Sequence, residues 1–212
     1  MTANPKKFYT PEEYLELERK SSYKSEYYDG EIFPMGDFEG DTPEAMAGAR
    51  SRHNAIKENA AFGLNVHVRK TGGCRVFTSD QRVHIPANGL YTYPDVVVIC
   101  GKPHFTDSEF DTFTNPVLIV EVLSKRTASY DRGEKFGLYR SIPTLSEYLT
   151  LDSRKIAVEL WRKTGATNWN LVCDTHEPEA VIPLESLNLT LFVADLYENL
   201  EDLPAVDFGF GR

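Results

Sequence analysis

A single glutamate interrupts an apolar run near the middle of the chain. The segment 116–124 reads Pro-Val-Leu-Ile-Val-Glu-Val-Leu-Ser, which places Glu121 among apolar side chains. A strand that is apolar on both faces is typical of the interior of a sheet. A carboxylate in that position loses its favourable hydration unless it is paired, protonated or bound to a metal. Glu121 is therefore the first residue that we expect to have a chemical role.

A second carboxylate stands at the start of the preceding apolar run. Asp95 follows Pro94 and precedes the run 96–100, which reads Val-Val-Val-Ile-Cys. If the two runs form neighbouring strands, Asp95 and Glu121 repel each other unless a cation lies between them. Oxygen ligands of this kind favour Mg²⁺ or Mn²⁺ over zinc. The structural alternative is that Asp95 caps a turn and that Glu121 forms a buried ion pair with an arginine.

A third carboxylate, Glu26, opens the segment 26–33. Asp29-Gly30 lies between aromatic and apolar residues in this segment and predicts a β-hairpin turn. Glu26 alone carries little information, because a solvated surface glutamate gives the same pattern.

A lysine lies in the helix that is predicted after Glu121. Lys135, Tyr139 and Ile142 are three or four positions apart, so they share one face of a helix over 128–141. An apolar face packs toward the sheet and could direct the Lys135 ammonium at the carboxylates. The alternative is a surface lysine that pairs with Asp131, one turn earlier.

The surrounding pattern predicts the elements that position these residues. A Thr-x-x-Glu capping box with Pro11 at the first helical position begins a helix over 10–20. A long helix over 45–70 follows the hairpin and ends at Gly72-Gly73. We expect strands at 74–79, 82–86, 94–100, 116–123, 147–152, 156–162 and 168–173, with short strands near 181–193. This order predicts an α/β (α+β) fold with a mixed sheet flanked by helices.

Length and composition limit the remaining possibilities. The chain has 212 residues, of which 41% are hydrophobic, and this predicts one domain or at most two. No apolar run is long enough to span a membrane. The three cysteines, Cys74, Cys100 and Cys173, are far apart, which argues against a disulfide framework and against a zinc site. We therefore expect a reduced, cytoplasmic protein.

The acidic charge is concentrated near the C-terminus. The formal net charge is −9, and the segment 174–211 has nine acidic residues and no lysine or arginine. Residues 1–173 are close to neutral, so this part of the chain could carry a local basic face despite the overall charge.

Taken together, the motifs resemble a known group of enzymes. Pro94-Asp95 followed by the buried Glu121 resembles the PD-(D/E)XK, or restriction-endonuclease-like, nuclease superfamily, and more closely its large bacterial family of putative restriction endonucleases. The matching segments run in order over about residues 9–173. They are Tyr9-Thr10-Pro11-Glu12-Glu13-Tyr14, Glu26-Tyr27-Tyr28-Asp29-Gly30-Glu31-Ile32, Ser51-Arg52-His53-Asn54-Ala55-Ile56, Ser79-Asp80 with Arg82-Val83, Tyr93-Pro94-Asp95-Val96, the segment 116–124, Tyr130-Asp131-Arg132-Gly133-Glu134-Lys135 with Tyr139, and Glu147-Tyr148.

The resemblance implies an activity and assigns roles to residues. It implies Mg²⁺-dependent or Mn²⁺-dependent hydrolysis of phosphodiester bonds in DNA by an endonuclease. Catalytic roles fall on Glu26, Asp95 and Glu121, of which Asp95 and Glu121 bind the metal. The motif lysine would stand at position 123, but the chain has Leu123 there. We therefore assign the catalytic lysine to Lys135, with Lys125 as the second candidate.

The resemblance also implies a domain division and partners. Residues 1–173 are expected to form the nuclease-like domain, with the acidic segment 174–212 packed on it or at a dimer interface. We expect Arg52, His53 and Lys125 to contact DNA, although a histidine at this position more often packs as a helix histidine near the sheet. A homodimer is expected because one site per chain must cut two strands. We expect the dimer surface to include apolar residues of the acidic segment, namely Leu191, Phe192, Leu196, Tyr197, Phe208 and Phe210.

Two other classes of function remain open at this point. One is a nuclease-fold protein that binds nucleic acid or a protein partner without cutting. The other is a two-carboxylate glycosidase, which we disfavour because its acids usually lie in an open cleft and not inside an apolar strand.

Overall fold

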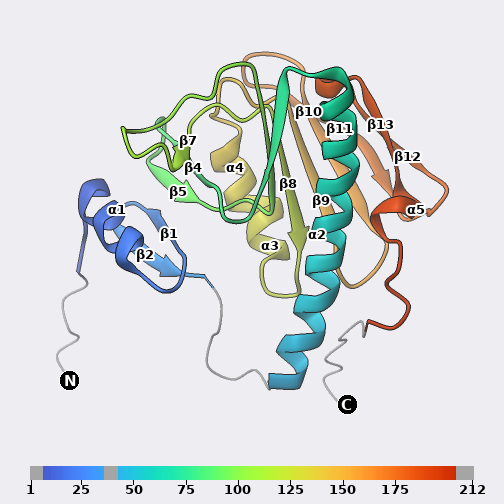
Figure 1. Cartoon of the computed structure of the whole chain (residues 1–212), viewed down its shortest axis with the longest axis horizontal. Coiled ribbons are helices and arrows are strands. Elements are labelled where there is room, and N and C mark those ends of the chain that lie inside the picture. Colours follow the sequence, from blue (N-terminus) through green and yellow to red (C-terminus); the bar gives the residue numbers. More distant parts are fainter. Residues whose placement is uncertain (1–6, 36–42, 204–212) are drawn as a thin grey trace.

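The computed structural model describes residues 7–35 and 43–203, with only the backbone of residues 43–50. A six-stranded mixed sheet forms its centre, and the long helix α2 (Pro43–Thr71) lies along one side of it (Figure 1). The strand order is β11 (Trp169–Thr175), β10 (Val158–Lys163), β9 (Glu147–Asp152), β8 (Leu118–Leu123), β6 (Val96–Cys100) and β3 (Cys74–Thr78). The structure therefore confirms the predicted mixed sheet flanked by helices.

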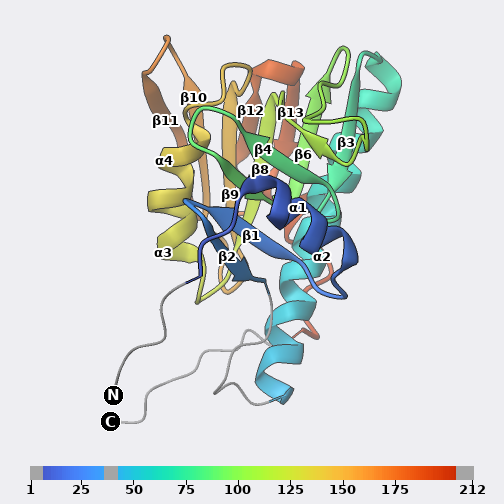
Figure 2. The same ribbon diagram turned by 90° about the vertical axis from the view of Figure 1, so that its left-hand side faces the viewer.

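A smaller five-stranded sheet lies in front of the other face of the central sheet (Figure 2). Its order is β2 (Glu31–Pro34), β1 (Ser25–Tyr28), β5 (Leu90–Thr92), β4 (Arg82–Ile85) and β7 (Thr112–Phe113). The first two strands form the predicted hairpin, whose turn residues Asp29 and Gly30 have φ angles of 48° and 82°. Positive φ at both positions is the requirement of a two-residue type I′ turn.

Helix α1 (Pro11–Lys20) precedes this hairpin and begins as predicted. The Thr10 side chain accepts a hydrogen bond from the Glu13 backbone N–H, and the Glu13 carboxylate accepts one from the Thr10 N–H at 2.8 Å. Each bond gives a partner to a backbone donor that would otherwise lack one, so the helix starts at a defined residue.

The central sheet divides the core into two layers, because successive side chains of a strand point to opposite faces. Val96, Val120 and Leu149 pack with Ile56 and other residues of α2 on one face. Neighbouring positions, among them Val97, Ile119 and Tyr148, pack on the other face, where the five-stranded sheet and α4 (Phe136–Tyr139) lie. By the same alternation Glu121 belongs to the second face, which the hairpin also covers.

The crossover between the parallel strands β8 and β9 contains a break in helical geometry. Instead of one helix over 128–141, the chain forms α3 (Ala128–Tyr130), a single π-helical turn η1 (Asp131–Lys135) and α4. Sequence spacing predicts a helix but not its hydrogen-bonding pattern, so the π turn was not foreseen. Strand β5 was also missed, because its three residues are too few to show a period.

The segment after residue 174 contributes to the main core. It forms β12 (Val181–Leu184), η2 (Glu185–Leu187), β13 (Leu189–Phe192) and α5 (Val193–Leu196). Leu191, Leu196 and Tyr197 are buried in the layer that α2 covers, so they are not part of an exposed dimer surface. Phe192 is 54% exposed. Phe208 and Phe210 lie outside the described residues.

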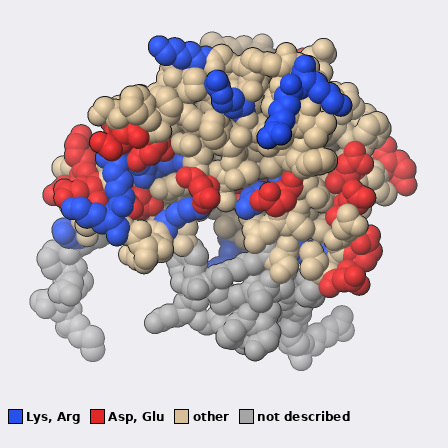
Figure 3. All heavy atoms as spheres, viewed as in Figure 1, with Lys and Arg blue, Asp and Glu red and all other residues tan. Residues whose placement is uncertain are grey.

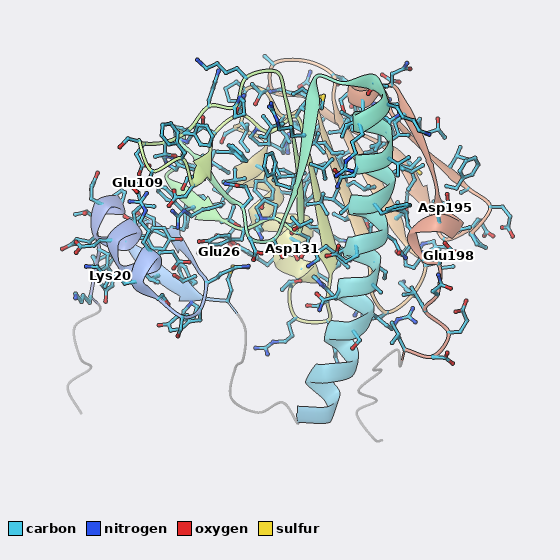
Figure 4. The ribbon with its side chains drawn as sticks, in the orientation of Figure 1. Lys20, Glu26, Glu109, Asp131, Asp195 and Glu198 are labelled. Atoms are coloured by element: carbon cyan, nitrogen blue, oxygen red, sulfur yellow. A yellow bond between two sulfur atoms is a disulfide. The ribbon has the colours of Figure 1, made fainter. Side chains whose placement is uncertain are left out.

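The acidic side chains of this segment face outward. Figure 4 shows Asp195 and Glu198 at the outer side of α5, and Figure 3 shows acidic side chains along that edge. Among the described residues, no helix is both long and apolar enough to cross a membrane.

The cysteine prediction was wrong. Cys74 and Cys100 form a disulfide although they are 26 positions apart in the sequence. They are directly opposite each other in the antiparallel pair β3 and β6, a register that the sequence does not reveal. Cys173 is the free cysteine. The cysteines therefore no longer support a reducing compartment.

Reduction of this disulfide is expected to lower the free energy of unfolding by about 3 kcal/mol. The bond closes a loop of 26 positions, and opening it increases the entropy of the unfolded chain. Urea unfolding with and without dithiothreitol measures the difference, and the Cys74→Ala/Cys100→Ala variant should match the reduced protein. Cys173→Ala is the control and should respond to dithiothreitol as the unmodified chain does. Equal stability with and without the reductant would contradict the prediction.

Candidate active site

A buried lysine joins carboxylates from three separate elements. The Lys135 Nζ lies 3.0 Å from Glu26 Oε1 on β1, 3.0 Å from Glu121 Oε1 on β8 and 3.7 Å from Asp131 Oδ1 in its own π turn. The Lys135 side chain is only 5% exposed. Figure 4 shows Glu26 and Asp131 facing each other where the β1 hairpin approaches α3. The hairpin, the central strand and the crossover thus meet at one ammonium group.

Packing against the sheet holds the π turn in place. Phe136 stacks on Tyr148 of β9 with ring centroids 4.7 Å apart, and the Tyr148 hydroxyl donates to the Asp131 carbonyl at 3.0 Å. Single π turns occur frequently at functional sites, where they reorient side chains. Here the turn directs both Asp131 and Lys135 toward the sheet, where both are buried.

Asp95, the residue before β6, lies beside Glu121 of the adjacent strand β8. The Asp95 N–H donates to Glu121 Oε2 at 3.3 Å, and Asp95 Oδ2 accepts from the Val122 N–H at 2.8 Å. Glu121 Oε1 also accepts from the Tyr139 hydroxyl at 2.7 Å. The lysine, and not an arginine, is the ion-pair partner of Glu121, so the alternative of a purely structural arginine pair was wrong.

His53 of α2 completes the group from the opposite side. Its Nε2 lies 3.2 Å from Asp95 Oδ2, and its side chain is 25% exposed. Burial acts to lower the pKa of His53, but the hydrogen bond to Asp95 and the charge of Glu121 outweigh it, so the pKa is raised. His53 therefore lies beside Asp95, one of the two predicted metal ligands, and its contact with DNA stays a prediction.

Negative charge is in excess in this buried region. Glu26, Asp95, Glu121 and Asp131 face the Lys135 ammonium and the His53 ring. Burial raises the pKa of Glu121 to about 8, with Asp131 and Asp95 adding to the effect and Lys135 and Tyr139 opposing it. Burial also raises the pKa of Asp131. An additional cation would lower the energy of the ionised carboxylates.

The donor set fits a hydrated magnesium ion better than a fully protein-coordinated metal. Within the described residues, no group of three or more His, Cys, Asp or Glu is arranged to hold a metal. Asp95 and Glu121 supply two carboxylates, and Mg²⁺ commonly binds one or two carboxylates while it keeps water or substrate oxygens. The Thr150 hydroxyl, buried and without a hydrogen-bond partner, belongs to the residue paired with Glu121 across β8 and β9. Water at the site would give this hydroxyl a partner.

Sequence reasoning missed some residues of the site. The Thr92 hydroxyl donates a hydrogen bond to Glu26 Oε1. Asp131, Tyr139 and Thr150 were not assigned to the site. Two spacings could have indicated members of this group: that of Lys135 with Tyr139 on one helix face, and that of Asp131 one turn before Lys135.

Two residues predicted to contact DNA lie elsewhere. Lys125 is exposed in the turn after β8. The Arg52 guanidinium donates to the carbonyls of Ser153 at 2.8 Å, Leu200 at 3.0 Å and Leu203 at 3.2 Å. Arg52 thus anchors the C-terminal segment on α2, and its contact with DNA stays a prediction.

Arg52→Ala is expected to lower the free energy of unfolding by about 2 kcal/mol, because it removes charge-assisted hydrogen bonds to three carbonyls. Urea unfolding followed by circular dichroism measures this loss. DNA affinity should stay unchanged. Arg52→Lys is the matched control and should recover part of the stability, since one ammonium cannot reach all three carbonyls. Unchanged stability with weakened DNA binding would contradict the anchoring role and favour Arg52 as a DNA contact.

The sequence of this chain is similar to those of a known protein family. The model of the Uma2 family, described as "Putative restriction endonuclease", matches residues 11–194. Two proteins of Synechocystis sp., both described as uncharacterized, are similar over most of their length. The protein sll1609 is 39% identical over 165 residues, which are 78% of this chain and 86% of its own. The protein slr1290 is 32% identical over 191 residues, which are 90% of this chain and 92% of its own.

A solved structure shares the fold. The crystal structure of a putative nuclease belonging to DUF820 from Anabaena variabilis matches with a TM-score of 0.66 and 20% sequence identity. The match covers 88% of this chain and 96% of the other. The two chains therefore share their overall fold.

Proposed function

Because the chain belongs to the Uma2 family of putative restriction endonucleases, we propose that it is a metal-dependent endonuclease that hydrolyses phosphodiester bonds of DNA. The observation that carries this proposal is the Lys135 ammonium, held 3.0 Å from both Glu26 and Glu121 beside Asp95. Carboxylates and a lysine in one buried group can hold a cation and stabilise the charge that develops on a phosphate.

Asp95 and Glu121 would hold Mg²⁺ or Mn²⁺ at this site. When bound, the ion polarises the scissile phosphate and lowers the pKa of a water molecule. Asp95 Oδ2 accepts a hydrogen bond from the Val122 N–H and lies 3.2 Å from His53 Nε2. Burial raises the pKa of Glu121 to about 8, so Glu121 must give up a proton to bind a cation at pH 7. The residues of this chain therefore link cation binding to the release of a proton.

Lys135 acts on the charge of the reacting phosphate. Its neighbouring carboxylates hold its pKa well above the usual value despite its burial, so the side chain stays an ammonium. Glu26 holds one side of the ammonium, and Thr92 in turn donates to Glu26. Lys135 is then positioned to orient the attacking water or to donate to a phosphate oxygen. His53, as the more exposed member, is placed to donate to a phosphate at the rim.

Cleavage of supercoiled plasmid and of single-stranded DNA tests this proposal. The protein is incubated in Mg²⁺, in Mn²⁺ and in EDTA, with Asp95→Asn prepared in the same way. Metal-dependent cutting that is absent from the variant supports the proposed site. Cutting by the variant at the wild-type rate would remove Asp95 from the mechanism, and cutting in EDTA would refute the metal requirement.

A binding protein without catalysis is the second candidate. Leu123 occupies the position of the motif lysine, and the described residues contain no three-ligand metal group. This candidate predicts that wild type and Asp95→Asn bind DNA alike and that neither cuts it in any metal.

We also propose that two copies act together on duplex DNA, because each chain has one candidate site and a duplex has two strands. Light scattering at micromolar concentration should give twice the mass of one 24.0 kDa chain. A mass of one chain in the presence and absence of DNA would contradict the dimer.

A further inference from the structure

Four basic side chains gather at the end of the central sheet that is remote from the candidate site. Arg69 and Lys70 end α2, Arg75 lies near the start of β3, and Lys102 follows β6. All four side chains are exposed. We name these four residues the basic end.

The basic end is free of acidic neighbours in sequence. The segment 59–79 and the segment 96–106 contain no Asp or Glu. Within the described part of the chain, none of the four basic side chains makes an ion pair, whereas Arg19, Lys24, Arg82, Arg132 and Arg162 all do. Figure 3 shows Lys and Arg side chains over the upper part of the molecule, where α2 ends, while most acidic side chains lie along its two sides.

Covalent and hydrogen-bonded links hold the basic end in one arrangement. The disulfide joins Cys74 to Cys100, one residue from Arg75 and two from Lys102. The Gly101 N–H also donates to the Gly73 carbonyl at 2.7 Å, which connects the turn after α2 to the segment after β6. Three separate elements therefore present their positive charges from a common rigid base.

The position of the basic end suits a long anionic ligand that also reaches the site. Arg69 follows His53 by 16 positions on the same helix, so the two are roughly 24 Å apart along its axis. A duplex advances about 3.4 Å per base pair. This axial distance corresponds to about seven base pairs of a duplex.

We propose that the basic end binds the phosphate backbone of the same duplex DNA, away from the bond that is cut. This inference rests on the proposed function and deepens it, because it assigns a second contact surface to the substrate. Four exposed charges without acidic partners, in a chain of net charge −9, complement a polyanion and carry no information on base sequence.

The salt dependence of binding to a 25-base-pair duplex tests this surface. All proteins carry Asp95→Asn to prevent cleavage. Lys70→Gln/Lys102→Gln removes two charges from the basic end, and Lys7→Gln/Lys20→Gln removes two charges near α1 as the matched control. The slope of log K against log salt should fall in magnitude by about 2 in the first variant and stay unchanged in the control.

The outcomes separate this inference from the proposed function. Equal slopes in the two variants, or no binding of the duplex by any of the proteins, would overturn the basic end as a DNA contact. Binding of vesicles with anionic lipids that depends on Lys70 and Lys102, without an effect on DNA, would also overturn it. A reduced slope in the first variant supports the surface even if the plasmid assay shows no cutting. Cutting with equal slopes supports the nuclease but not this surface.

Discussion

Glu121→Gln is expected to abolish metal-dependent cleavage and at the same time to stabilise the metal-free protein. The amide keeps the shape of the side chain but cannot carry the charge that holds a cation. In the folded protein burial raises the pKa of Glu121 to about 8, from an ordinary value near 4.5. At pH 7 folding therefore requires this carboxyl to take up a proton, at a cost of up to about 3 kcal/mol. We expect the free energy of unfolding to rise by about 1–3 kcal/mol, and cleavage to fall by at least about a hundredfold.

The raised pKa of Glu121 also predicts how the stability of the metal-free protein depends on pH. Between pH 4.5 and about 8 the folded protein holds a proton on Glu121 that the unfolded chain has lost, so the stability of the metal-free protein falls as the pH rises through this window. Glu121→Gln should lack this part of the pH dependence. Thermal unfolding in EDTA at several pH values measures both curves. The exposed Glu109→Gln is the control and should retain the wild-type curve. A destabilised Glu121→Gln protein would show that the ionised carboxylate is favourable in the fold.

Lys135→Met is expected to have the opposite effect on stability with a similar loss of activity. The substitution leaves Glu26 buried without its ammonium partner, and it removes the positive charge that lowers the pKa of Glu121. We expect the free energy of unfolding to fall by about 3 kcal/mol, and cleavage to fall about a hundredfold to a thousandfold. Urea unfolding and plasmid cleavage in Mg²⁺ measure the two effects separately.

Lys125, the second candidate for the catalytic lysine, provides the matched control for Lys135→Met. Lys125 lies in the exposed turn after β8, so Lys125→Gln should keep most of the cleavage and all of the stability. Adding Glu121→Gln to Lys135→Met should recover stability without recovering cleavage, because it removes one of the two carboxylates that lost their partner. Loss of cleavage in Lys125→Gln with normal cleavage in Lys135→Met would move the catalytic role to Lys125.

The features that could be predicted from the residues alone are those that depend on near neighbours in the chain. The capping box at Thr10 and Glu13 and the turn at Asp29-Gly30 form as predicted, because each is a hydrogen-bonding or φ requirement of a few consecutive residues. The apolar run around Glu121 likewise indicated a central strand, since two apolar faces need cover on both sides. That a carboxylate in such a run needs a partner followed from the cost of burying charge alone.

Tertiary structure decided which partners these residues have. Glu26 and Lys135 meet because the hairpin and the π turn pack over the same face of the sheet, and neither spacing nor composition fixes that packing. The pairing of Cys74 with Cys100 depends on the register of two strands, which is set by the whole sheet. The role of Arg52 also could not be predicted from the sequence, because a long arginine side chain can extend into solvent or donate to backbone carbonyls. Only the path of the C-terminal segment determined that it donates to carbonyls at residues 153, 200 and 203.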